Sequence, residues 1–239
     1  MIYVMSDIHG NKERFDSIMS QIDLTQEDTL YVLGDVIDRF PDGVRILRQL
    51  MKMPNVKLLI GNHEYMMLNA LDTDLQFSEM GPQQRMTYTY NLSLWYRNGG
   101  KVTHNYLKHI RKDIRKEIFT YLQSLPLYYD IEVNGMQYKL VHAAPIDKYG
   151  EWDHGHYINE KEFAVWHRIE ELLELPDNYT LVFGHTPTIY FQNSNPTSIW
   201  YGQNRICIDC GAGYSRADNI QTRLACLRLD DYKEFYSTI

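Results

Sequence analysis

The sequence has few cysteines, no long apolar run and no excess of positive charge. Its only cysteines, among 239 residues, are Cys207, Cys210 and Cys226, an odd set that argues against a disulfide framework and favours a reducing cytoplasm. No apolar stretch approaches the length of a membrane span, and Asp7 interrupts the first residues before a signal peptide could form. We therefore expect a cytoplasmic protein with no membrane partner.

The charge balance argues against a nucleic-acid partner. The chain has 24 Lys and Arg against 31 Asp and Glu, with a formal net charge of -7. A nucleic-acid surface needs a basic stripe to offset phosphate charge. The richest basic stretch, residues 108–117, carries acidic residues at helical spacing and is interpreted as a solvated helix face.

Cys207 and Cys210 form a C-x-x-C pair, which raises the question of a redox or zinc site. The pair lies in RICIDC, an apolar stretch typical of a strand. A redox pair usually opens a helix, and a structural zinc site needs a second pair of ligands. We therefore predict buried strand cysteines with no such role.

Apolar residues are abundant: 44% of the chain is hydrophobic and 13% aromatic, which is ample for a large core. No repeat or Gly/Ser-rich linker is present, so we expect a single domain spanning residues 1–239. Strand-like stretches alternate with helical patterns at about 12–21 and 43–52, which predicts a largely parallel sheet. Residues 63–125 then predict a mostly helical insertion, with a break at Gly99-Gly100.

After this insertion the pattern predicts strands. The stretches LYYDIEV and MQYKLVH flank Asn134-Gly135, the strongest short hairpin signal. A helix at about 159–174 should precede the strand YTLVFGH, and several short strands follow. The expected class is α/β, with mixed sheets and helices outside.

Five of these strands end independently in Asp, Asn or His. The residues are Asp7 and His9, Asp35 and Asp38, Asn62 and His63, His142, and His185. In open α/β sheets, ligands bind beyond the carboxyl ends of the strands, so these side chains can converge. Turns commonly use Asp and Asn but give no special reason for histidine. The pattern therefore favours a shared cation site.

The stretches SDIHG, GDVIDR, GNHE, VHAA and FGHT, followed by IDCGAGY, resemble in order the motifs of the calcineurin-like metallophosphoesterases. More closely they resemble the bacterial and phage serine/threonine protein phosphatases and the symmetrical diadenosine tetraphosphate hydrolases. The resemblance covers nearly the whole chain. It implies a four-layer α/β/β/α fold, in which mixed sheets pack as a sandwich flanked by helices.

The resemblance also implies two divalent metal ions about 3.5–4 Å apart. Their ligands would be Asp7, His9 and Asp35 for the first ion, and Asp35, Asn62, His142 and His185 for the second. The shared ligand, Asp35, would bridge both ions, which would lower the pKa of a bound water toward ~7 and supply hydroxide for in-line attack on phosphorus. Manganese is the expected ion in vitro, with iron or zinc as alternatives.

By the same resemblance, His63 is the acid that protonates the leaving alkoxide and Asp38 orients it. A carboxylate on one ring nitrogen fixes the tautomer and raises the pKa of the other nitrogen. Since His63 follows Asn62, on an extended strand end it should face the substrate side. The alternative is a helix-start residue without a catalytic role.

Substrate phosphate is expected to contact Arg39, whose planar fork suits an oxyanion, together with Asn62. The family suggests a second arginine, and Arg168 in VWHRIEE is the candidate. The alternative for Arg168 is one more charged residue on an amphipathic helix.

The chain departs from the family pattern at Phe40, where glycine is usual. A bulky residue adopts positive φ only at a cost, so either this loop differs or φ is negative there. His154 and His156 form an H-x-H that is interpreted as a solvated loop rather than a substrate contact. His104 and His109 are expected on an exposed helix.

We predict a metal-dependent phosphomonoesterase that acts on phosphoserine or phosphothreonine in proteins, or on a small phosphoester. The alternative is a symmetrical dinucleoside polyphosphate hydrolase, in which tyrosines of the insertion stack on a base. A third hypothesis is a non-catalytic phosphate-binding protein on the same fold. The oligomeric state is left open.

Overall fold

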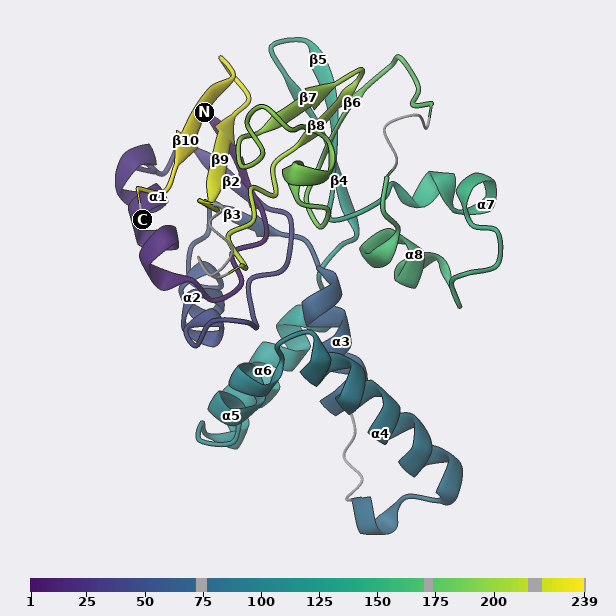
Figure 1. The fold of residues 1–239 in the computed structure, drawn as a ribbon. Helices are drawn as coiled ribbons and strands as arrows, with labels where there is room; N and C mark the ends of the chain where they lie inside the picture. The colour runs from purple at the N-terminus through teal and green to yellow at the C-terminus, as the bar shows by residue number, and fades with distance from the viewer. Residues whose placement is uncertain (72–76, 170–173, 215–220, 239) are drawn as a thin grey trace.

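The computed structural model describes residues 1–71, 77–169, 174–214 and 221–238 (Figure 1). Within them, one five-stranded sheet has the order β10-β9-β1-β2-β3. The strands are β1 (Ile2–Met5), β2 (Thr29–Val32), β3 (Val56–Leu58), β9 (Ala225–Arg228) and β10 (Lys233–Tyr236). The first three are parallel, and β9 is antiparallel to both of its neighbours.

A second five-stranded sheet, also within the described residues, has the order β4-β5-β6-β8-β7. Its strands are β4 (Tyr128–Val133), β5 (Met136–Val141), β6 (Thr180–Phe183), β7 (Trp200–Gly202) and β8 (Arg205–Cys207). The strands β5, β6 and β8 are parallel, and each edge strand is antiparallel to its neighbour. The predicted hairpin is confirmed: Asn134 and Gly135, with φ of 52° and 78°, join β4 to β5 in a two-residue turn.

The alternation of side chains along the strands creates the layers. In β1, Tyr3 and Met5 pack into a core with the helices of the first sheet, whereas Val4 packs between the two sheets. In β6, Val182 faces that same middle layer and Phe183 faces the outer helices of the second sheet. Period-2 alternation therefore builds a sheet-on-sheet sandwich.

Helices cover both outer faces of the sandwich (Figure 1). The first sheet is covered by α1 (Lys12–Ile22) and α2 (Gly43–Leu50), while α7 (Tyr149–Trp152) and α8 (Glu160–Trp166) lie against the second. The predicted four-layer α/β/β/α fold is confirmed.

Between β3 and β4 the described residues are mostly helical and extend away from the sheets (Figure 1). This extension contains α3 (Asn62–Leu71), α4 (Pro82–Arg97), α5 (Lys101–Leu107) and α6 (Lys112–Gln123). The turn at Gly99-Gly100 separates α4 from α5 as predicted. Short 3₁₀ turns lie at Phe77–Glu79, Ile146–Lys148 and Thr188–Tyr190.

Two predictions about the helices outside the site need correction. The helix expected at 159–174 ends at Trp166, where the carbonyl of that residue contacts the His185 ring instead of continuing the helix; Arg168 therefore does not lie on it, and residues 170–173 are outside the described part. His104 is half-buried rather than exposed, because its ring stacks on Trp95 at 5.6 Å and its Nδ1 contacts the Tyr96 hydroxyl at 2.6 Å.

All three cysteines are free and buried, and burial was predicted for Cys207 and Cys210; Cys207 lies in β8 as expected, whereas Cys210 lies beyond the end of that strand. Burial raises the pKa of all three thiols, which disfavours the reactive thiolate. Among the described helices, none has both the length and the apolar character needed to cross a bilayer.

Candidate metal centre and active site

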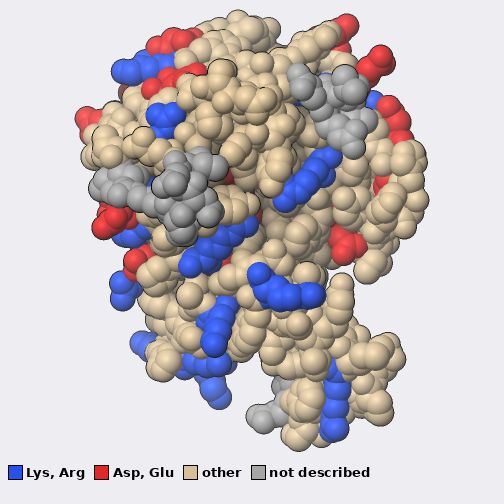
Figure 2. All heavy atoms as spheres, viewed as in Figure 1, with Lys and Arg blue, Asp and Glu red and all other residues tan. Residues whose placement is uncertain are grey.

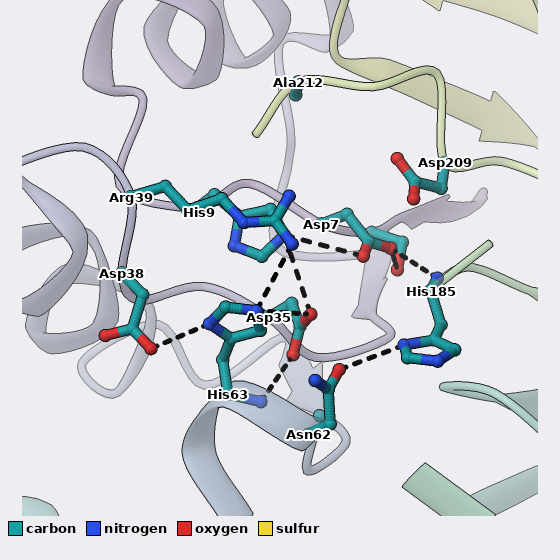
Figure 3. A network of polar contacts seen from close by, with 12 residues as sticks. Asp7, His9, Asp35, Asp38, Arg39, Asn62, His63, His185, Asp209 and Ala212 are labelled. Carbon is teal, nitrogen blue, oxygen red and sulfur yellow. Dashed lines mark hydrogen bonds and ion pairs between the residues drawn. The ribbon is translucent and has the colours of Figure 1, made fainter. Parts of the chain in front are cut away.

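Five strands deliver their polar ends to one place (Figure 3). Asp7 follows β1, Asp35 follows β2, Asn62 follows β3, His142 follows β5, and His185 follows β6. All five side chains are buried, with at most 7% of their surface exposed. The two sheets therefore bring together residues separated by up to 178 positions, as between Asp7 and His185.

Several of the site residues have a backbone conformation that is costly for residues other than glycine. Positive φ angles occur at Asp7, His9, Asp35, Asp38, Arg39 and His185. Such conformations persist where surrounding contacts stabilise them, and they concentrate at functional sites. Here the β1 and β2 loops bind each other: the His9 N–H donates to the Asp35 carbonyl at 2.9 Å and the Gly10 N–H donates to the Val36 carbonyl at 2.8 Å.

Three imidazoles are held in a fixed orientation by backbone carbonyls. His9 Nδ1 lies 3.2 Å from the Ile37 carbonyl, His142 Nδ1 lies 2.7 Å from the Leu33 carbonyl, and His185 Nε2 lies 3.1 Å from the Trp166 carbonyl. Since a carbonyl only accepts, each of these nitrogens carries the proton. The other nitrogen of each neutral ring therefore presents a lone pair to the site.

These lone pairs meet other acceptors. Both His142 Nε2 and His185 Nδ1 lie 3.0 Å from Asn62 Oδ1. His9 Nε2 lies 3.6 Å from an Asp35 oxygen and 3.8 Å from an Asp7 oxygen. A set of acceptors facing one another is stabilised by positive charge between them, which a divalent cation provides.

Asp35 lies at the centre of this arrangement. Two groups of ligand atoms, each within 4.8 Å, could hold a metal: His9, Asp35 and His63, and Asp35, His142 and His185. Their shared member is Asp35, the expected bridge. The first group contains His63 where the sequence analysis expected Asp7, which lies against His9. Burial, followed by the neighbouring carboxylates of Asp7 and Glu64, holds the pKa of Asp35 well above its ordinary value.

Burial also lowers the pKa of the three carbonyl-bound histidines. The decrease is large for His9 and His185, and the cationic Arg39 and the ring of His142 respectively add to it. His142 is shifted in the same direction. All three rings are therefore held neutral, which is the state that ligates a metal.

His63 differs from these three. Its Nδ1 lies 2.7 Å from Asp38 Oδ2, a carboxylate rather than a carbonyl. Burial alone lowers the pKa of His63, but the Asp35 and Asp38 carboxylates outweigh burial and raise it. The sequence analysis placed this residue on an extended strand end; it lies instead in the first turn of α3, with Nε2 facing the site 3.8 Å from Asp35.

Arg39 lies beside His63 with its guanidinium directed toward the site (Figure 3). Its Nη2 is 3.4 Å from His63 Nε2, and its guanidinium lies 5.0 Å from the centre of the Tyr214 ring. A Cβ at Gly213 would overlap the His9 ring and approach Arg39, so this glycine permits their close packing. Arg168 is exposed, and its Nη1 lies 3.4 Å from the His185 carbonyl, so it borders the site.

The backbone conformation shows how Phe40 is accommodated where glycine is usual in the family. Positive φ falls on Asp38 and Arg39, at 73° and 65°, and not on Phe40. The phenylalanine is therefore accommodated without left-handed strain. His154 and His156 are exposed in the loop after α7.

Sequence reasoning missed Glu64, the last residue of GNHE. Its buried carboxylate accepts four backbone N–H groups: those of Asp35 and Val36 at 2.9 Å, Gly61 at 3.1 Å and Ile37 at 3.3 Å. It therefore holds the β2 and β3 loops together. An acidic residue directly before the apolar stretch YMML was the available signal.

Asp209 was also missed. It follows β8, is 4% exposed, and accepts the Gly211 N–H at 2.9 Å. Burial, and then the charge of Asp7, raises its pKa well above the ordinary value. In Figure 3 it lies on the side of the site nearest Asp7. The signal in the sequence was its position after a strand, in IDCGAGY.

A two-sheet sandwich with carboxylate, imidazole and amide ligands at its strand ends is typical of metal-dependent hydrolases. The family model of the calcineurin-like phosphoesterases matches residues 1–220. The chain belongs to this family and is a phosphoester hydrolase.

Individual relatives agree with this assignment. The chain is 28% identical over 193 residues to serine/threonine-protein phosphatase 2 of Salmonella typhimurium, covering 77% of this chain and 78% of that protein. It is 34% identical over 71 residues to the symmetrical bis(5'-nucleosyl)-tetraphosphatase of Delftia acidovorans, covering 29% of this chain and only 25% of that protein. The crystal structure of a metallophosphoesterase from Sphaerobacter thermophilus has a similar fold, with a TM-score of 0.56, 16% identity and coverage of 100% and 87%.

Proposed function

We propose that this protein is a phosphomonoesterase of the serine/threonine protein phosphatase type. The observation that carries the proposal is the division among four buried histidines. In three of them, His9, His142 and His185, the pKa is lowered and the free nitrogen faces acceptors; in His63 the pKa is raised and the partner is a carboxylate. When the surroundings lower the pKa of some histidines and raise the pKa of another, the neutral rings can act as metal ligands and the protonated ring can act as a proton donor.

The residues of the site fit a pair of divalent cations. Asp7, His9 and Asp35 would hold one cation, and Asp35, Asn62, His142 and His185 the other. When bound, the pair supplies Lewis acidity and acidifies water for in-line attack on phosphorus. Manganese is the ion we propose for activity in vitro, with iron or zinc as alternatives.

The remaining residues handle the substrate. Asp38 holds the Nδ1 proton of His63, so that protonated His63 presents its Nε2 proton toward the leaving-group oxygen. Arg39 binds phosphoryl oxygens from the adjacent position, with Asn62 and Arg168 as further phosphate contacts. Lys and Arg side chains gather around the middle of the face shown in Figure 2, although the net charge is -7. This local positive charge suits an anionic substrate.

One observation favours a phosphorylated protein or peptide as the substrate, and another bears on where the protein acts. The phosphatase relative is matched along three quarters of both chains, whereas the tetraphosphatase match is confined to a short segment. The unpaired buried cysteines agree with the cytoplasmic location that we propose.

A substrate panel tests this function. Manganese-loaded protein is assayed against an aryl phosphate, a phosphoserine peptide and diadenosine tetraphosphate. We expect turnover of the first two, abolished by EDTA and restored by manganese. Faster turnover of diadenosine tetraphosphate would replace the proposed substrate class, and unchanged turnover in excess chelator would contradict a metal-dependent mechanism.

A further inference from the structure

The Asp38–His63 pair has a further partner in the helical extension. Trp95 lies near the end of α4 and is 0% exposed, although most of that helix is exposed. Its Nε1 donates to Asp38 Oδ2 at 2.7 Å. Asp38 Oδ2 therefore accepts from both His63 and Trp95, at the same distance.

The second Asp38 oxygen makes no such bond. Asp38 is 0% exposed, and its Oδ1 has no hydrogen-bond partner among the described residues. The two donors on Oδ2 thus account for the orientation of the carboxylate. Without the indole N–H, the carboxylate would be held from one side only, by the imidazole that it is meant to orient.

The same extension also holds the backbone on either side. Thr103 Oγ1 in α5 accepts the Asp38 N–H at 3.0 Å, and the Gly99 carbonyl accepts the Arg39 N–H at 3.3 Å. Asp38 and Arg39 both have positive φ, a conformation that needs such contacts from outside the loop. A Cβ at Gly100 would overlap the Trp95 indole, so the Gly-Gly turn permits this arrangement.

We infer that Trp95 is a positioning residue for general-acid catalysis, and that the α4–α5 turn forms a clamp on the Asp38-Arg39 loop. The inference rests on the proposed function. By this inference the helical extension contributes to protonation of the leaving group. The indole N–H holds the Asp38 carboxylate in place, and Asp38 in turn holds the His63 ring in the orientation from which it donates its proton. A tryptophan that merely filled the core would stabilise the fold without affecting proton donation.

Leaving-group dependence separates these two roles. Protonation by His63 matters for phenyl phosphate, whose leaving group is poor, and hardly matters for 2,4-dinitrophenyl phosphate, whose leaving group departs as a stable anion. We expect Trp95→Phe to lower kcat for phenyl phosphate by about tenfold, part of the ~10²–10⁴-fold supplied by a general acid, with less than about twofold loss on the dinitrophenyl ester. Equal losses on both esters would overturn the inference.

A matched control is Trp200→Phe. Trp200 is also a buried tryptophan, but it lies on β7, with its ring stacked on Phe191 at 4.5 Å. This variant should leave the ratio of the two rates unchanged. In an Asp38→Asn background, Trp95→Phe should add no further leaving-group selectivity, because the two residues act through one proton donor. Independent, additive effects would contradict the proposed route.

An NMR measurement tests the hydrogen bond between Trp95 and Asp38 without any enzyme activity. In ¹⁵N-labelled metal-free protein, the indole resonance lost in Trp95→Phe identifies Trp95, and Asp38→Asn should move that resonance upfield. An unmoved resonance would show that the hydrogen bond is absent. If Trp95→Phe does not fold, Thr103→Val removes the acceptor of the Asp38 N–H and should show the same selectivity. Failure of the wild type on both esters would refute the proposed function and leave the NMR result to decide the hydrogen bond.

Discussion

The Glu64 carboxylate binds the backbone of Asp35, and the Asp35 carboxylate binds the backbone of the residue before Glu64, beside the candidate metal centre. Glu64 Oε2 accepts the Asp35 N–H at 2.9 Å, and Asp35 Oδ1 accepts the N–H of His63, the neighbour of Glu64, at 3.0 Å. The loops after β2 and β3 are thus held together by two carboxylates. The Glu64 carboxylate binds backbone N–H groups, whereas the Asp35 carboxylate binds one backbone N–H and also faces the site.

This arrangement predicts that Glu64→Gln destabilises the protein. The amide loses the charge and places N–H donors against the backbone N–H groups that the carboxylate now binds. Hydrogen bonds to charged groups and unsatisfied donors suggest a loss of about 1–3 kcal/mol in the free energy of unfolding, measurable by urea denaturation. Glu117→Gln, at an exposed position of α6, is the control. Equal stability of both variants would contradict this role.

Asp35→Asn should impair binding of both metal ions. Asp35 belongs to both groups of potential ligand atoms, so its loss affects two coordination shells, whereas Asp7→Asn or His142→Asn affects one. After manganese loading and desalting, elemental analysis should find less metal in Asp35→Asn than in either other variant. Asp16→Asn, on the exposed face of α1, should bind like the wild type. Indistinguishable losses from the three ligand variants would refute the bridge.

Metal binding should release a proton through Asp35. The pKa of Asp35 is raised by burial and then by neighbouring carboxylates, so the folded, metal-free protein keeps the Asp35 proton to a higher pH than the unfolded chain does. The contribution of this protonated carboxyl to stability is fully present below the pKa of Asp35 in the unfolded chain. It is lost as the pH rises through the higher pKa of Asp35 in the folded protein. Metal affinity should therefore increase with pH across this window.

Calorimetric titration of the metal in two buffers of different ionisation enthalpy measures that release. The carbonyl-bound histidines should contribute little near neutral pH, since the pKa of each is lowered. In Asp35→Asn, titrated at the higher metal concentrations that its weaker binding requires, we expect fewer protons to be released per metal ion bound than in the wild type. Proton release of the same size in this variant would assign it to another group.

His63→Asn should affect poor leaving groups selectively. Removal of a general acid typically costs ~10²–10⁴-fold in rate, and we expect this loss on phenyl phosphate but a much smaller one on 2,4-dinitrophenyl phosphate. His109→Asn, at an exposed position after α5, is the control. Steady-state kcat values for both esters provide the measurement, and a uniform loss would argue for a ligand role of His63 instead.

Gly100→Ala tests the packing of the α4–α5 turn. The added methyl group overlaps the buried indole of Trp95, and overpacking typically costs about 1–3 kcal/mol. Gly150→Ala is the matched control, because a Cβ there meets nothing within 4 Å. Thermal unfolding should separate the two variants, and equal midpoints would show that the turn relaxes freely.

Local pattern was sufficient for much of the fold. Strands, the Asn134-Gly135 hairpin and the Gly99-Gly100 break depend on neighbours in the chain, so periodicity and turn chemistry predicted them. The end of the helix at Trp166 did not follow from periodicity, because the His185 ring, 19 positions away, contacts the carbonyl there. The burial of His104 likewise depends on its stacking with Trp95.

The sequence by itself determined which chemical groups are available: carboxylates, imidazoles and an amide at the ends of buried strands, in the order of a known family. Only the tertiary structure decided what each group does. The tautomer of each imidazole, the four N–H groups on Glu64 and the indole on Asp38 come from contacts across separate elements. Hydrogen bonds are short-ranged and directional, so their partners are set by the positions of whole strands and helices, which a linear pattern does not contain.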